Sequence, residues 1–388
     1  MSDNAAFSFT TVTQLISEAG AARQLGKHIA SRFPKVRRAL LVTDPGFLNT
    51  GLVEAPAHSL EQHNIQVMIY SDVVADPPEN IVLKAVEFAR NNDVDLIIGL
   101  GGGSSMDVAK LIAVLAKSDQ AIAQIYGIGN VTGDRLPLVQ IPTTAGTGSE
   151  VTNIAIVTTG ATTKMGVVAS PLYADLAILD AELTLGLPPM VTAATGIDAM
   201  VHAIEAFTSK HKKNPISDML ARQALALLAP NLLTACENGS NLKARQAMLL
   251  GACFAGQAFS NAPVAAVHAL AYPIGGIFHV PHGLSNSLVL PHVLRFNLPE
   301  AMAHYAELAG IIAPHVGGST EARAEALIVA MQQIAKITGI ETTLQQVGIQ
   351  ESDLDRLADE AMLQTRLLGN NPREVRREHA RAIYAAAL

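Results

Sequence analysis

The chain has 388 residues, of which 49% are hydrophobic and 16% charged, and its formal net charge is −7 at pH 7. This length predicts two domains, and the sparse charge predicts a large core and at least a homodimer. The negative charge, without any Lys/Arg-rich run, argues against a nucleic-acid partner. The two cysteines have no metal-binding spacing and the N-terminal residues lack the features of a secretory signal, so we expect a cytoplasmic protein.

Short β-rich runs alternate with helical patterns through the first half of the chain. The expected strands are residues 37–44, 65–72, 94–103, 136–144 and 175–180, and the expected helices between them are 77–92 and 104–117. Such alternation predicts an α/β fold with a mostly parallel, Rossmann-like sheet and helices on its faces. Two further runs, 150–159 and 163–170, predict a hairpin.

Long helical patterns replace this alternation after the Leu-Pro-Pro at 187–189. They include residues 217–233 and 320–339, and no convincing strand follows residue 187. We therefore expect an α/β domain over residues 1–187 and an all-helical domain over residues 188–388.

The tract from Gln246 to Leu294 contains no Asp, Glu, Lys or Arg. A membrane-spanning helix needs about 20 continuous apolar residues, and prolines, glycines and polar residues interrupt each candidate window here. The tract is therefore interpreted as buried core, and no membrane partner is expected. It nevertheless holds four histidines: His268, His279, His282 and His292.

The stretch "IIGLGGGSSMDVAK" places glycines directly after an expected strand and before an expected helix. This context suits a phosphate group, because backbone N–H groups and the helix N-terminus can hold the anion. The stretch is not a Rossmann fingerprint, since Ser104 stands where the final glycine is expected, and no GK[ST] follows to make a P-loop. A tight strand-to-helix turn is the alternative interpretation.

Two other strand ends could contact a nucleotide. Asp44 ends the first expected strand, where a carboxylate can accept both hydroxyls of an adenosine ribose and repel a 2′-phosphate. It could equally be a turn-initiating Asp before Pro-Gly. The loop "QIPTTAGTGSEVT", residues 140–152, offers hydroxyls and small residues, which is a weak signal by itself.

The helical stretch "TGIDAMVHAIEAF" carries a polar stripe beside its apolar face. Asp198, His202 and Glu205 are spaced i, i+4, i+7 and therefore share one narrow sector of the helix. One carboxylate with several histidines suits Fe²⁺ or Zn²⁺ in a site with nitrogen and oxygen ligands. A surface pair of Asp198 and His202 is the alternative, but histidines in the uncharged tract downstream need polar partners.

Four stretches in order, "GGGSSMDVAK", "PTTAGTGSEVT", "TGIDAMVHAIEAF" and "HALAYPIGGIFHVPHGLSNSLVLPH", together resemble the iron-dependent (group III) alcohol dehydrogenase family. That family includes lactaldehyde reductases and propanediol dehydrogenases. The resemblance covers essentially the whole chain and implies a dehydroquinate synthase-like architecture. It also implies hydride transfer between a small primary alcohol or diol and NAD, with Fe²⁺ or Zn²⁺ bound. The reverse reaction would reduce the corresponding aldehyde.

The resemblance further implies roles for individual residues. The implied metal ligands are Asp198, His202, His268 and His282. The implied cofactor contacts are Gly102, Gly103 and Ser104 on the pyrophosphate, Thr143 and Thr144, Lys164 on the nicotinamide-side ribose, and Asp44, which matches the acid associated with NAD preference. Glu205 is not a family ligand, and we expect it to support the site without touching the metal.

Two departures from the family pattern bear on the substrate and the proton path. Tyr272 stands four residues after His268, where many members have a histidine, and the stretch before His268 has Pro263 and Ala265 where a glycine-containing stretch is common. We hypothesise that His279 takes over part of the proton relay, because an imidazole suits that task better than a phenol, while Tyr272 shapes the pocket. His279 as an exposed loop residue is the alternative.

Three other functions compete with this interpretation. A glycerol dehydrogenase-like zinc enzyme is the nearer of the alternatives. A dehydroquinate synthase-like lyase would need several basic residues around a phosphate-bearing substrate, and the tract around the expected ligands has none. A non-catalytic scaffold would have no reason to keep all four ligands.

Overall fold

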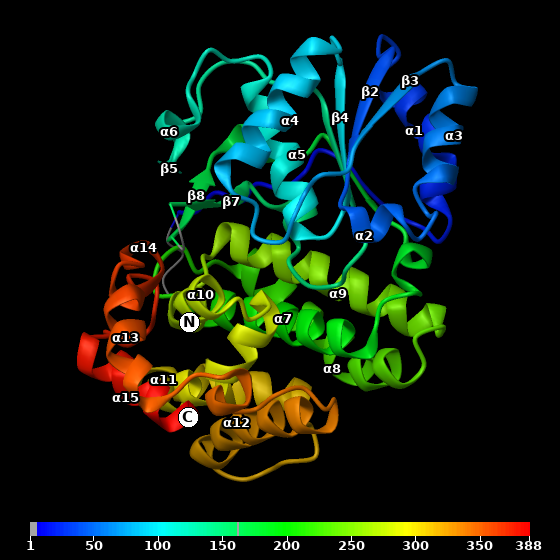
Figure 1. Ribbon diagram of the computed structural model, residues 1–388. Helices are drawn as coiled ribbons and strands as arrows, with labels where there is room; N and C mark the ends of the chain where they lie inside the picture. The colour runs from blue at the N-terminus through cyan, green and yellow to red at the C-terminus, as the bar shows by residue number, and fades with distance from the viewer. Residues whose placement is uncertain (1–5, 161–162) are drawn as a thin grey trace. The chain divides into compact units, whose positions relative to one another are not determined.

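Parallel strands with crossover helices form the first half of the chain, and helices form the second, in the computed structural model, which describes residues 6–160 and 163–388 (Figure 1). The chain divides into two compact units. One is Thr11–Gly186, called here the α/β unit, and the other is Leu187–Leu388 with residues 6–10, called the helical unit. The α/β fold followed by an all-helical part confirms the predicted fold class.

The α/β unit is built on one six-stranded parallel sheet in the order β1-β9-β6-β4-β2-β3. Its strands are β1 (Leu15–Ser17), β2 (Arg38–Val42), β3 (Gln66–Tyr70), β4 (Leu96–Gly101), β6 (Leu138–Pro142) and β9 (Leu176–Leu179). Five of these six strands are predicted by the sequence. The edge strand β1 escapes prediction because three residues are too few to show a period.

Both faces of this sheet are covered, which explains its continuous apolar strands. Alternate side chains such as Leu41, Ile98 and Val139 belong to one core cluster, which also contains Leu25 and Leu60. Intervening side chains such as Leu40 and Ile97 are equally buried on the other face. The helices of this unit are α1 (Leu25–Arg32), α2 (Pro45–Leu48), α3 (Glu54–Gln62), α4 (Glu79–Asn91), α5 (Gly103–Leu115) and α6 (Ile122–Ile125).

A second, three-stranded sheet contains the predicted hairpin. Strands β7 (Ile154–Thr159) and β8 (Thr163–Val168) pair antiparallel, and β5 (Gly127–Ile128) adds to β8 in parallel. Residues 161–162, in the expected connection, lie outside the described residues.

The helical unit contains only helices and their connections within its described residues. Its main helices are α7 (Pro189–Thr208), α8 (Pro215–Glu237), α9 (Leu242–Asn261), α10 (Ala266–Phe278), α11 (His282–Ile312), α12 (Thr320–Ile337), α13 (Leu354–Met362), α14 (Thr365–Leu368) and α15 (Arg377–Ala387). The uncharged tract forms most of α9, all of α10 and the first half of α11, and most of its side chains are buried. Its lack of charge is therefore explained by burial.

Among the described residues, one helix, α8, is long and apolar enough by composition to cross a membrane. It packs along α7 and α9 inside the helical unit. Leu232 of α8 lies against Gly196 of α7, and Leu228 lies against Gly251 of α9. These contacts account for its apolar side chains.

Candidate metal centre and cofactor loops

The polar stripe predicted on residues 195–207 lies on α7, a helix buried along most of its length. Asp198 and His202 are 2% and 4% exposed, so they are not the surface pair of the alternative interpretation. Two buried polar side chains on a mostly apolar helix require partners. Those partners come from two other helices.

Three helices bring four potential ligands together. His268 lies in the first turn of α10 and His282 is the first residue of α11, after Pro281. One donor atom from each of Asp198, His202, His268 and His282 lies within 4.8 Å of the others. The Oδ1 atom of Asp198 is 3.9 Å from Nε2 of His268 and 3.7 Å from Nε2 of His282. These separations leave room for one cation between the atoms.

The His202 imidazole is stacked between neighbouring rings, whereas the His282 ring is tilted by 51° from that of His268. The His202 ring stacks on Phe259 at 4.4 Å and on His268 at 4.7 Å, measured between centroids. The His268 ring is 5.4 Å from that of His282. Phe259 therefore limits the tilt of His202 from the side away from the cluster.

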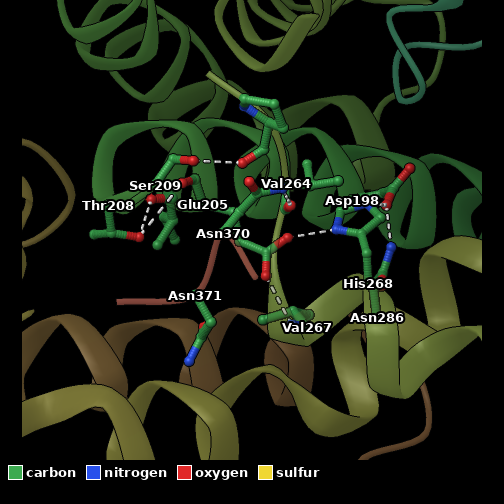
Figure 2. A network of polar contacts seen from close by, with 12 residues as sticks. Asp198, Glu205, Thr208, Ser209, Val264, Val267, His268, Asn286, Asn370 and Asn371 are labelled. Atoms are coloured by element: carbon green, nitrogen blue, oxygen red, sulfur yellow. Dashed lines mark hydrogen bonds and ion pairs between the residues drawn. The ribbon is translucent and has the colours of Figure 1, made fainter. Parts of the chain in front are cut away.

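Glu205 determines which nitrogen of His268 faces the cluster (Figure 2). Its Oε2 atom lies 2.6 Å from Nδ1 of His268, and its Oε1 atom accepts a hydrogen bond of 2.7 Å from the Val267 N–H. Because an ionised carboxylate only accepts hydrogen bonds, Nδ1 carries the proton and Nε2 keeps its lone pair. That Nε2 atom is buried and has no hydrogen-bond partner among the described residues. A divalent cation fits this lone pair and its carboxylate neighbour.

Asp198 is prepared as an anion. Burial by itself would raise the pKa of its carboxyl, but His202, His282 and His268 and a hydrogen bond from Asn286 hold that pKa below its usual value. The Asn286 amide donates to Oδ1 of Asp198 at 2.6 Å. The carboxylate is thus both ionised and oriented within the cluster (Figure 2).

A close approach of two helices places His282 beside Asp198. A Cβ atom on Gly283 would lie 2.4 Å from the Ala194 carbonyl oxygen of α7 and 3.3 Å from Cβ of Asp198. The glycine therefore lets the first turn of α11 lie directly against α7.

The structure places the two predicted proton-path residues differently. Tyr272 lies one turn after His268 on α10, is half-buried, and has its ring centroid 6.0 Å from that of His282. His279 ends α10 in the left-handed conformation, with φ of 56°, and is exposed. The exposed position agrees with the alternative interpretation of His279, and its role in proton transfer stays a prediction.

All the expected cofactor residues of the α/β unit except Lys164 lie at the carboxyl ends of β2, β4 and β6. Gly102 is the N-cap of α5 and Gly103 its first residue, while Gly102, Gly103 and Ser104 are partly exposed. The Thr143 N–H donates to the Gly101 carbonyl at 3.0 Å, which joins the loop after β6 to the end of β4. This is the edge at which parallel α/β sheets bind ligands.

Asp44 and the second loop both lie close to these glycines. Asp44 Oδ1 caps α2 by accepting from the Phe47 N–H at 2.9 Å, and Oδ2 lies 3.6 Å from where a Cβ on Gly101 would be. A Cβ on Gly103 would approach Thr147 Cγ2 to 2.8 Å, so the glycine is needed where the two loops touch. Asp44 thus initiates the turn through Oδ1, and its Oδ2 atom still lies close to Gly101 at the end of β4.

Lys164 lies on β8 and is 9% exposed. Its ammonium group forms an ion pair with Asp76. The expected contact of Lys164 with a ribose stays a prediction.

A buried lysine that the sequence analysis did not single out connects helix α5 to the loop after β6. Lys110 of α5 is fully buried and donates to Ser149 Oγ at 2.7 Å, Thr152 Oγ1 at 3.0 Å and the Ile154 carbonyl at 2.7 Å. Asp107, one turn earlier, accepts from Ser149 Oγ at 2.6 Å. The i, i+3 spacing of Asp107 and Lys110 was the available signal, but an exposed helix pair has the same spacing.

An α/β unit with such loops and a helical unit with such a cluster supply what an enzyme needs to use both a nucleotide and a divalent cation. Comparison with known proteins identifies the family. The model of the iron-containing alcohol dehydrogenases matches residues 12–181, and that of the C-terminal part of the Fe-containing alcohol dehydrogenase family matches residues 192–388. The chain belongs to the iron-containing alcohol dehydrogenase family.

Individual relatives agree with this assignment along nearly the whole chain. The chain is 43% identical to long-chain-alcohol dehydrogenase 1 of Geobacillus thermodenitrificans, with 91% of each chain covered, and 36% identical to the NAD-dependent methanol dehydrogenase of Bacillus methanolicus, with 86% and 89% covered. The crystal structure of a 1,3-propanediol oxidoreductase superposes with a TM-score of 0.95 at 34% identity, covering 99% of this chain and 100% of that one.

The protein is therefore an NAD-dependent, metal-dependent oxidoreductase that acts on alcohols. This confirms the resemblance, the class of enzyme and the pair of cofactors expected from the sequence. The scaffold and lyase alternatives fall away.

Proposed function

We propose that Asp198, His202, His268 and His282 hold the catalytic metal, Fe²⁺ or Zn²⁺. The observation that carries this proposal is the buried Nε2 atom of His268, whose lone pair faces Asp198 because Glu205 holds the proton on Nδ1. A metal bound there supplies Lewis acidity for the alcohol oxygen, and a nicotinamide cofactor accepts the hydride. The protein side chains orient these groups and exclude water from three of the four ligands, which are buried.

The cofactor is held, in this proposal, at the carboxyl ends of β2, β4 and β6. Gly102, Gly103 and Ser104 at the start of α5 offer backbone N–H groups to the pyrophosphate. Thr143 and Thr144 offer hydroxyls, Lys164 reaches the nicotinamide-side ribose, and Asp44 accepts from the adenosine ribose. The nearness of Asp44 to Gly101 supports this set.

The substrate is a small primary alcohol or diol, and the reverse reaction reduces the aldehyde. Relatives named for long-chain alcohols, for methanol and for 1,3-propanediol have the primary alcohol in common. Tyr272, whose ring lies beside His282, shapes the space around the reacting carbon. His279 passes the alcohol proton to water, since it is exposed and lies three residues before His282.

The metal assignment is tested by chelation and by paired histidine variants. Metal-free protein should lose turnover of primary alcohols with NAD, and Fe²⁺ or Zn²⁺ should restore it. His282→Ala should lose bound metal and activity, because it opens the coordination sphere. His292→Ala, in the same helix but outside the cluster, is the control and should retain both. Full turnover by a thoroughly metal-free preparation would refute the proposal.

The protein is further proposed to be a cytoplasmic homodimer or larger homo-oligomer. Cys236 and Cys253 are buried thiols that form no disulfide, which suits a reducing compartment. Large apolar side chains, including Ile337 and Leu363, are exposed in the single chain. Light scattering coupled to size-exclusion chromatography should give a mass of at least two chains, and a monomer at micromolar concentration would contradict this.

A further inference from the structure

The proposed ligand His268 lies in the first turn of α10, directly after a segment of irregular structure. Residues Pro263–Ala265 form this segment and connect α9 to α10; of their carbonyl groups, that of Ala265 accepts a helical hydrogen bond, from the Ala269 N–H at 3.0 Å. By contrast, Asp198 and His202 lie well inside the long helix α7. The position of His268 therefore depends on what holds this connecting segment.

Side chains from other elements bind the backbone of this segment at two points and that of the first turn of α10 at a third (Figure 2). Ser209 Oγ donates to the Pro263 carbonyl at 2.7 Å. Asn370 Nδ2 donates to the Val264 carbonyl at 3.0 Å. Glu205 accepts from the Val267 N–H, and its other oxygen binds His268 itself. The carbonyl groups of Pro263 and Val264 thus each have a side-chain donor.

The two donors are themselves joined. Ser209 is the C-cap of α7, and the next N–H along the chain, that of Lys210, donates to the Asn370 carbonyl at 2.7 Å. The Asn370 amide also donates to the Arg366 carbonyl of α14 at 3.1 Å. The end of α7, the connecting segment and the turn after α14 are therefore one hydrogen-bonded assembly, although they lie far apart in the sequence.

We propose that Asn370 and Ser209 are positioning residues of the metal centre. They fix the position of the connecting segment relative to α7. His268 Nε2 and the Asp198 carboxylate can then bind the same cation while Glu205 accepts a hydrogen bond from Nδ1. Neither residue touches the cluster. This inference rests on the proposed function of the four ligands, and it makes metal affinity depend on a turn near the C-terminus of the chain.

Asn371 provides a matched control. It is buried beside Asn370, but its amide pairs reciprocally with Asn297 at 2.9 and 2.7 Å and donates to the Arg373 carbonyl. Asn371→Ala should therefore lower stability through a comparable loss of buried hydrogen bonds. It removes no contact with the connecting segment.

The experiment loads metal-free full-length protein with Co²⁺, followed by its visible absorption, and measures the dissociation constant by chelator competition. Asn370→Ala should weaken Co²⁺ binding about tenfold, the lower end of the effect of removing a ligand's support, and alter the Co²⁺ spectrum. Ser209→Ala, a smaller change, should act in the same direction. Asn371→Ala should bind Co²⁺ as the unaltered protein does, at a comparable loss of melting temperature.

The outcomes distinguish a failure of the proposed metal centre from a failure of the positioning role. If the unaltered protein fails to bind Co²⁺, the metal centre itself is wrong. If it binds, and both Asn370→Ala and Ser209→Ala keep its affinity and spectrum, the positioning role is refuted while the metal centre stands. Equal weakening by Asn370→Ala and Asn371→Ala would also refute it, because general loosening of the helical unit would then be sufficient.

Discussion

At the scale of single residues, the proposed metal centre depends on the partners of its ligands as well as on the ligands, as His268 and Asp198 show. His268 can present Nε2 because Glu205 occupies Nδ1, and Asp198 stays ionised because imidazoles and the Asn286 amide surround it. Such partners fix ring orientation and tautomer, and they raise ligand basicity. Glu205 lies on the same helical stripe as the two proposed ligands Asp198 and His202, and its role is to orient His268.

Asp44 should control the choice between NAD and NADP. Asp44→Ser keeps a side chain that can cap α2 but removes the charge that repels a 2′-phosphate. The NADP to NAD ratio of kcat/KM should rise about 5- to 150-fold, equivalent to roughly 1–3 kcal/mol. Steady-state kinetics with both cofactors measures this. An unchanged ratio would show that Asp44 lies away from the ribose.

His279 and Tyr272 should affect different kinetic parameters. His279→Gln should lower kcat with metal content unchanged, because it removes the relay imidazole. Tyr272→Phe should mainly alter KM across a series of alcohols, because it changes the surface beside His282. If His279→Gln keeps the kcat of the unaltered protein, the exposed residue has no part in proton transfer.

At the scale of secondary-structure elements, the cluster is made by the packing of α7, α10 and α11. Each helix contributes at least one proposed ligand, and α11 begins at one of them, His282, directly after Pro281. The uncharged tract supplies two of these helices, and its apolar side chains let them pack closely. The close approach at Gly283 is the tightest of these requirements.

Gly283→Ala should separate α11 from α7. The added methyl group would meet the Ala194 carbonyl oxygen of α7 at 2.4 Å, and backbone cannot move aside as a side chain can. We expect at least a tenfold loss of metal affinity as His282 shifts from Asp198. Gly310→Ala, in the same helix with open space around it, is the control. Equal metal affinity in both variants would contradict the close-packing argument.

At the scale of the whole molecule, both units hold their functional loops with buried polar groups. In the helical unit these are Glu205, Ser209 and Asn370, and in the α/β unit they are Lys110 and Asp107. Burial lowers the pKa of Lys110 to about 8, although Asp107 and Glu150 act in the opposite direction. Burial therefore disfavours the charged form of Lys110. The hydrogen bonds of its ammonium group nevertheless connect α5 to the loop after β6.

The free energy of unfolding should depend on pH in the alkaline range because of Lys110. Between pH 8 and about 10.5 the unfolded chain binds the Lys110 proton and the folded chain has released it, so the free energy of unfolding gains a contribution that rises with pH. Compared with Lys110→Met, the unaltered protein should become relatively more stable by up to about 1.4 kcal/mol per pH unit. Denaturant unfolding at several pH values measures the difference, and parallel pH curves would contradict it.

The order of the elements could be predicted from the sequence because periodicity is local. Alternating β-rich runs and helical patterns indicate the parallel sheet and its helices, and the long apolar helical patterns indicate the second half. The spacing of Asp198 and His202 likewise needs only one helix to be understood. The glycines between β4 and α5 indicate a loop at a strand end for the same reason.

Only the tertiary structure decided how distant residues support one another. The hydrogen bonds from His268 to Glu205 and from Asn370 to Val264 join residues 63 and 106 positions apart, and no local period encodes such pairs. The sequence likewise left Lys110 undistinguished from a surface lysine, because burial is a property of the packed unit. The sequence alone determined which residues could be ligands. Packing determined that His268 presents Nε2 to the cluster, because Glu205 binds its Nδ1 atom.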